Sequence, residues 1–203
     1  MCGILGSTNP DVSINILNSC LNKINHRGPD ETILTNFPDS TVTFGMKRLA
    51  IRDLSHQLYP FSYRHYRLII NGEIYNTTEI KKLIPNYKPK TTCDSESILP
   101  LYHRYGTKCF DLLIGMFAIA IYDLQKNEII IARDKFGEKP LYYSTDFNSL
   151  FFASETTAFP NQYQKITVTP DLDFYLNKSK GRYFSVTRKF LTENFDELMT
   201  NDN

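Results

Sequence analysis

The sequence lacks the features that mark several large classes of protein. It has no apolar run long enough to cross a bilayer, and no basic region precedes its first short apolar stretch. Its 23 Lys and Arg residues nearly balance 22 Asp and Glu residues, for a formal net charge of +1. We therefore expect a cytoplasmic protein that binds neither a membrane nor nucleic acid.

Cysteine is scarce, and the sequence lacks the usual cofactor motifs. No CxxC pair occurs, and histidines do not cluster near any cysteine, so a metal site is not expected. Neither GxxxxGK[ST] nor GxGxxG is present, so no phosphate-cradling loop is expected and this chain should carry no cofactor. Free thiols also fit the reducing cytoplasm. The cysteines are Cys2, Cys20, Cys93 and Cys109, and we interpret the last three as structural.

Apolar periodicity predicts an α+β domain built in layers. Neighbouring strands are separated by short turns such as Lys126-Asn127, which favours antiparallel pairing, and amphipathic helices can cover the sheet faces. Asp11 is a plausible N-cap for the first helix. We place the domain at residues 1–185 and a polar tail or linker at 186–203. The expected strands are 2–7, 41–46, 67–71, 116–122, 128–133, 141–144 and 150–153, and the expected helices are 12–24, 78–84 and 94–105.

Cys2 is a candidate nucleophile because of its position. Removal of Met1, which is normal before a small second residue, would give Cys2 a free α-amine with an ordinary pKa of roughly 7.7–8.0. That amine can be neutral near physiological pH and accept the proton of the adjacent thiol, which puts nucleophile and base on one residue. A buried strand could equally begin with a cysteine.

Four further residues could serve an acyl transfer from an amino-acid amide. Asn71 and Gly72 follow an apolar strand and offer a side-chain amide and a backbone N–H to one oxyanion, although Asn-Gly is also a common turn. Arg48 could hold an α-carboxylate in two hydrogen bonds, or be a solvated charge. Asp94 could bind an α-ammonium, cap the following helix, or do both.

Together these residues resemble the class II glutamine amidotransferase domain, specifically the asparagine synthetase type. The resemblance covers residues 1–158 and rests on blocks in a fixed order. These are Cys2-Gly3-Ile4, His26-Arg27-Gly28-Pro29-Asp30, Arg48-Leu49-Ala50-Ile51, Asn71-Gly72-Glu73-Ile74-Tyr75-Asn76, Cys93-Asp94-Ser95-Glu96, residues 115–123 and residues 132–143.

The resemblance implies a fold and a set of roles. The fold would be that of N-terminal nucleophile hydrolases, a four-layer αββα sandwich of two antiparallel sheets. Cys2 would attack the side-chain amide of L-glutamine, with Asn71 and Gly72 as the oxyanion hole. Binding would fall to Arg48 for the α-carboxylate, Asp94 with Glu73 for the α-ammonium, and Ile51 in the pocket lining.

Two departures from the family pattern and one missing motif bear on the partner. Ser154-Glu155-Thr156-Thr157-Ala158 lacks the usual lysine, and Thr169-Pro170-Asp171 lacks the usual glycine. The chain contains no Ser-Gly-Gly-x-Asp-Ser nucleotide-binding loop, so we expect a separate ATP-dependent synthetase or ligase that binds the ATP and Mg. Two alternatives stay open: a catalytically idle glutamine-binding or regulatory relative, and an N-terminal-nucleophile amidase acting on another amide.

Overall fold

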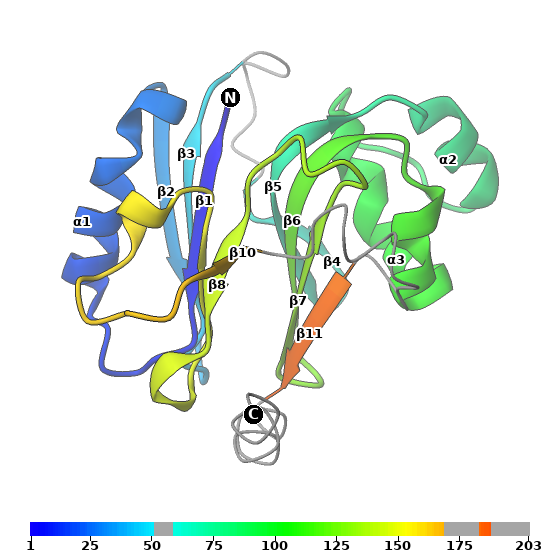
Figure 1. The fold of residues 1–203 in the computed structure, drawn as a ribbon. Helices are drawn as coiled ribbons and strands as arrows, with labels where there is room; N and C mark the ends of the chain where they lie inside the picture. Colours follow the sequence, from blue (N-terminus) through cyan, green and yellow to red (C-terminus); the bar gives the residue numbers. More distant parts are fainter. Residues whose placement is uncertain (51–58, 169–182, 188–203) are drawn as a thin grey trace, which may run out of the picture.

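The protein folds into four layers. The structure is a computed structural model that describes residues 1–50, 59–168 and 183–187. Two antiparallel sheets stack face to face, with helix α1 on one outer face and helices α2 and α3 on the other (Figure 1). The αββα sandwich implied by the resemblance is therefore confirmed.

The first sheet carries the N-terminal strand near its centre. Its order is β10-β8-β9-β1-β3-β2, and β1 pairs with β3 in a register that sets Gly3 opposite Lys47. Ser154 also fastens β1, because its hydroxyl accepts the N–H of Ile4 and its own N–H reaches the Ile4 carbonyl, each at 2.9 Å. The strands are β1 (Gly3–Ser7), β2 (Glu31–Asn36), β3 (Thr43–Arg48), β8 (Tyr142–Ser144), β9 (Phe151–Ala153) and β10 (Thr167–Val168).

The second sheet is built around two long neighbouring strands. Its order is β11-β7-β6-β5-β4, and β5 pairs with β6 along its whole length, from Tyr66 opposite Asp123 to Ile74 opposite Gly115. In contrast, β4 pairs with β5 only between Tyr66 and Leu68. The strands are β4 (Phe61–Tyr63), β5 (Tyr66–Ile74), β6 (Gly115–Asp123), β7 (Glu128–Arg133) and β11 (Tyr183–Thr187).

The helices lie where the periodicity predicts, but two predicted caps are wrong. Ser13 caps α1, because its hydroxyl accepts the N–H of Ile16, so Asp11 lies before the cap. Asp94 begins a 3-10 helix and makes no cap bond, since its carboxylate crosses to β5 instead. The α-helices are α1 (Ile14–Lys23), α2 (Thr77–Leu83) and α3 (Ile98–Tyr105), and the 3-10 helices are Asn25–Arg27, Asp94–Ser97, Gly106–Leu112, Asp146–Asn148 and Thr156–Ala158.

Strand alternation divides the apolar residues among three cores. Successive side chains point to opposite faces of a sheet, so Ile4 enters the core between the sheets while Leu5 packs towards α1. On β5, Ile69 faces the other sheet, whereas Leu68 and Ile70 face α3. The space between the sheets is therefore lined by buried apolar side chains, which matters for the polar groups that enter it at one end.

The sequence pattern missed four strands: β2, β4, β10 and β11. All four are the edge strands of their sheets. β4 and β10 have too few residues to show period-two alternation, and the burial of β2 is too mixed. β11 extends beyond residue 185, while residues 188–203 lie outside the described part. The boundary between domain and tail stays a prediction.

Candidate active site

Successive side chains of a strand alternate between its two faces. Two of the predicted side chains therefore lie at the same end of the space between the sheets. Ile4 of β1 lies in the inter-sheet core, so Cys2, two residues earlier, also faces inward and packs against that core. Met46 of β3 lies in the same core, so Arg48 at the end of β3 follows it inward. The two strands are antiparallel, which brings the start of β1 next to the end of β3.

The thiol of Cys2 lies against the backbone of Leu49. The N–H of Leu49 donates to Sγ at 3.4 Å, and Sγ is 3.8 Å from the Leu49 carbonyl oxygen. The carbonyl of Cys2 accepts a 3.0 Å hydrogen bond from Nε of Arg27. The contact with Leu49 fixes the position of the sulfur, and the Arg27 bond holds the residue's backbone.

Arg27 is itself held by Glu155. Arg27 is buried and pairs with the Glu155 carboxylate at 2.8 Å, which also lies 2.9 Å from Nε2 of His26. Burial would raise the pKa of Glu155, but the hydrogen bonds from Arg27 and His26 outweigh it and hold this pKa below its ordinary value. Glu155 therefore remains an anion at neutral pH. No local sequence pattern indicates this role.

The Arg-Gly-Pro-Asp motif fixes the segment that contacts the thiol. Gly28 lies so close to β3 that a Cβ there would overlap the carbonyl of Lys47, which explains the glycine. The carboxylate of Asp30 accepts the N–H of Ala50 at 2.7 Å, and the N–H of Asp30 donates to the carbonyl of Arg48 at 3.2 Å. Leu49 is thus fixed on both sides.

Asn71 presents a buried amide donor without a partner. It follows Ile69 on the inward face of β5 and is 1% exposed. Within the part of the chain that the structure describes, Nδ2 of Asn71 has no hydrogen-bond acceptor. An unsatisfied buried donor costs about 1–3 kcal/mol, so the fold retains an unfavourable group whose natural use is to bind a ligand oxygen.

Gly72 offers a backbone N–H beside that amide. The N–H groups of a strand alternate between its two edges, so that of Gly72 points to the same edge as that of Ile74, which meets Asp94 Oδ2 at 2.6 Å. β4 pairs with this edge no further than Leu68. A Cβ at Gly72 would overlap the carbonyl of Met116, which explains a glycine within a strand.

The predicted substrate-binding residues are also brought to this end of the sheets. Arg48 lies 3.2 Å from the carboxylate of Glu31 and 6.0 Å from the ring centre of Tyr59. Asp94 is 8% exposed, and its other carboxylate oxygen is 3.7 Å from Sγ of Cys93. Glu73 continues the inward face of β5. The predicted pocket residue Ile51 lies outside the described residues.

The charges of both the nucleophile and the binding residues act on Tyr59. Burial raises the pKa of its hydroxyl well above the ordinary value, and the charges of Cys93, Cys2 and Asp94 raise it further, while Arg48 lowers it. All four groups therefore lie near one phenol. Sequence reasoning missed Tyr59, because a tyrosine beside a proline carries no signal of its own, and it missed the proximity of Cys93.

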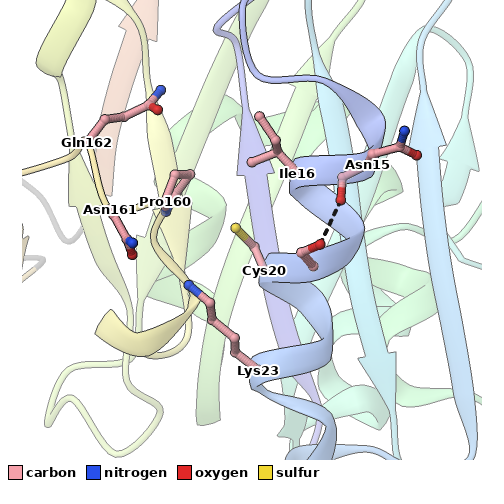
Figure 2. A pocket seen from close by; sticks show the side chains of 8 residues that line it. Asn15, Ile16, Cys20, Lys23, Pro160, Asn161 and Gln162 are labelled. Atoms are coloured by element: carbon pink, nitrogen blue, oxygen red, sulfur yellow. Dashed lines mark hydrogen bonds between the residues drawn. The ribbon is translucent and has the colours of Figure 1, made fainter.

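Other parts of the described structure offer no rival centre. No group of three or more His, Cys, Asp or Glu is arranged to hold a metal among the described residues, and no described helix is long and apolar enough to span a bilayer. A groove of about 380 Å³ lies between α1 and residues 160–162 (Figure 2). Residues from α1 and 160–162 line it, and none is a candidate site residue.

Comparison with known proteins decides the family. The family model described as "Glutamine amidotransferase domain" matches residues 1–198. The chain belongs to this family. The motif-based recognition of a glutamine amidotransferase domain is thereby confirmed.

The chain is also similar to parts of larger enzymes. It is 40% identical over 163 residues to "Asparagine synthetase [glutamine-hydrolyzing] 2" of Bacillus subtilis, a match covering 76% of this chain and 22% of that protein. It is 33% identical over 162 residues to an asparagine synthetase [glutamine-hydrolyzing] of Triphysaria versicolor, covering 78% and 27%. The asparagine synthetase type is therefore confirmed, although the chain spans only about a quarter of these relatives.

A solved structure shares the fold. Glutamine phosphoribosylpyrophosphate amidotransferase from B. subtilis, complexed with ADP and GMP, aligns with a TM-score of 0.63 and 23% identity. The match covers 82% of this chain and 44% of that chain. It supports the sandwich architecture alone.

Proposed function

We propose that this domain hydrolyses the side-chain amide of L-glutamine to glutamate and ammonia, with Cys2 as the nucleophile. The observation that carries the proposal is the unpartnered amide of Asn71, buried at the inward end of β5 beside the N–H of Gly72. A side-chain amide donor and the backbone N–H of the next residue suit the oxyanion of an acyl transfer. Family membership makes the amide of glutamine the natural acyl donor.

The proposed reaction proceeds in two half-reactions. The thiol proton of Cys2 moves to the α-amine, and Sγ forms a bond to the amide carbon of the substrate. Asn71 and Gly72 stabilise the negative oxygen, and the α-ammonium returns the proton to the leaving nitrogen as the C–N bond breaks. Water, deprotonated by the α-amine, then attacks the γ-glutamyl thioester, which releases glutamate and restores the thiol.

Arg48 and Asp94 would select a free amino acid. A guanidinium binds a carboxylate in two hydrogen bonds, and a buried carboxylate suits an α-ammonium. Both groups act electrostatically on Tyr59, as Cys2 also does. This pair argues against an amidase for peptides or simple amides, whose substrates lack one or both charges.

The ammonia acceptor would belong to an ATP-dependent synthetase, such as an asparagine synthetase. The relatives with that name are several times longer than the matched region, so the acceptor chemistry, with its ATP and Mg, would lie outside this domain. The cytoplasm is the proposed location. The free thiols of all four cysteines are compatible with it.

The decisive experiment is a glutaminase assay on the purified protein. We expect ammonia release from L-glutamine, little from N-acetylglutamine, which lacks the α-ammonium, and none from glutamine with Cys2→Ala. The electrophile 6-diazo-5-oxonorleucine should label Cys2 and leave Cys20, Cys93 and Cys109 unmodified. Glutamine binding without hydrolysis would show an idle relative. Equal rates on N-acetylglutamine would show an amidase of another kind.

A second assay addresses the partner. Glutamine hydrolysis should rise when the synthetase and its acceptor are added, because a partner that favours the competent conformation raises the active fraction. The matched control is the same partner without acceptor. A hydrolysis rate that changes with neither the synthetase nor its acceptor would show that the domain works alone.

A further inference from the structure

Lys139 is a buried lysine in a loop that the fold holds rigidly. It follows β7 and is 6% exposed. The carboxylate of Asp134 organises the loop by accepting backbone N–H bonds from Phe117, Phe136, Glu138 and Lys139 at 2.9–3.1 Å. Nε of Arg133 also donates to the Lys139 carbonyl at 2.8 Å. These bonds fix the backbone of Lys139 and hence the point from which its side chain extends.

The ammonium of Lys139 points to the first residue of the chain. Its Nζ lies 3.2 Å from Sδ of Met1, and a thioether is only a weak acceptor. Within the described residues, no carboxylate lies at ion-pair distance from Nζ. Lysine is rarely buried without a partner, so the sequence retains a charge that does not stabilise the fold through an ion pair.

Removal of Met1 changes what this charge faces. The thioether would leave, and the new α-amine of Cys2 would form at the other end of the residue whose Sδ contacts Nζ. The other described cations near Cys2 each have a carboxylate partner: Arg27 and His26 both contact Glu155, and Arg48 lies beside Glu31. Tyr59 is neutral at physiological pH. Lys139 is then the nearby cation whose charge is not offset by a described carboxylate.

We propose that Lys139 is a positioning residue that keeps the α-amine of Cys2 uncharged, so that this amine can act as the base. The inference rests on the proposed glutaminase function and deepens it. A neighbouring cation disfavours the protonated form of an amine, and enzymes use this device to activate amines at neutral pH.

The test compares Lys139→Met, Lys139→Arg and the control Lys135→Met, which removes an exposed lysine from the same loop. The acidic limb of the kcat/KM profile reports the free enzyme's base. In Lys139→Met this acidic limb should move up by about one pH unit. The value of kcat/KM should therefore fall about tenfold at pH values well below the limb and change little above it. Lys139→Arg should retain the original limb, and Lys135→Met should match the parent.

A second readout separates this proposal from the glutaminase assignment. The ¹³Cα shift of Cys2 in the processed protein, assigned by its loss in Cys2→Ala, follows the titration of the α-amine without any substrate. The α-amine should titrate at higher pH in Lys139→Met than in the parent. An unchanged titration would overturn the role of Lys139 even if glutamine is hydrolysed. A shifted titration in a protein that hydrolyses no glutamine would overturn the proposed function and leave the contact intact.

Discussion

Arg27 donates a 3.0 Å hydrogen bond from Nε to the carbonyl oxygen of Cys2. Terminal residues are usually poorly ordered unless they are tied down, and a nucleophile at a chain terminus would lose positional accuracy for that reason. Arg27, fixed by Glu155, supplies the tie from outside β1. The Arg-Gly-Pro-Asp motif is therefore best understood as a support for the nucleophile.

The first prediction concerns processing of Met1. The active protein should begin at Cys2, because a retained Met1 would convert the proposed base into an amide nitrogen. Intact-mass measurement on active protein checks this. Full hydrolytic activity in protein that retains Met1 would contradict the mechanism, whatever the effect of Cys2→Ala.

Asn71→Ala should lower kcat about 100- to 1000-fold with little change in KM, because an oxyanion donor acts chiefly in the transition state. The free energy of unfolding of this variant should fall less than that of an ordinary core truncation, because the amide donor has no described partner to lose. Steady-state kinetics and urea unfolding measure the two effects. A change confined to KM would remove Asn71 from the oxyanion hole.

Asp94→Asn should raise KM for glutamine more than it lowers kcat. Losing a charge-assisted contact to the substrate costs about 2–5 kcal/mol when the pair is buried. The amide can still accept the N–H of Ile74, which the carboxylate receives at 2.6 Å, so the fold should survive. Unchanged KM with intact secondary structure would assign the α-ammonium to another group, such as Glu73.

Gly72→Ala should reduce both stability and activity. The added methyl would overlap the carbonyl of Met116 in β6, so the two central strands must separate where the oxyanion hole lies. Overpacking of this kind typically costs about 1–3 kcal/mol. The control is Gly106→Ala, where no described atom lies within 4 Å of the new Cβ but the backbone is left-handed. It should lose stability through backbone strain and retain turnover.

Glu96 should make stability depend on acidic pH. Its carboxylate, 9% exposed, accepts bonds from Tyr87, Lys90 and Thr91. Burial would raise its pKa, but these bonds lower it. A carboxylate with a depressed pKa stabilises the fold at pH values above its ordinary pKa of about 4.3. This stability is lost as the pH falls through the folded-state pKa. Glu96→Gln should cost about 1.5–3 kcal/mol at pH 7, and its deficit should shrink below about pH 4.

The sequence predicts the layers and most of the site because both rest on local patterns. Alternating apolar residues identify the long strands, and the parity of Cys2, Arg48 and Asn71 relative to core residues already fixes the face to which each points. Sequence alone does not show that these faces meet at one end. That depends on the register of β1 with β3 and on the stacking of the sheets.

The missed residues act over long sequence separations. Glu155 supports Arg27, and Lys139 reaches Met1, across more than a hundred positions each. Tyr59 draws its significance from neighbours on other elements. None of these has a spacing rule, so only the tertiary structure reveals them. Asp94 shows the converse: a cap is the natural local interpretation, and a long-range acceptor role replaces it.

The pairing of β11 with β7 bears on where this domain can be cut for separate production. β7 carries the run Ile129-Ile130-Ile131-Ala132, and β11 occupies its outer edge from Tyr183 to Thr187. A chain ending before Tyr183 would expose that apolar strand as an open edge, which is a template for aggregation. We therefore expect soluble expression to need the segment through Thr187, independently of any role in catalysis.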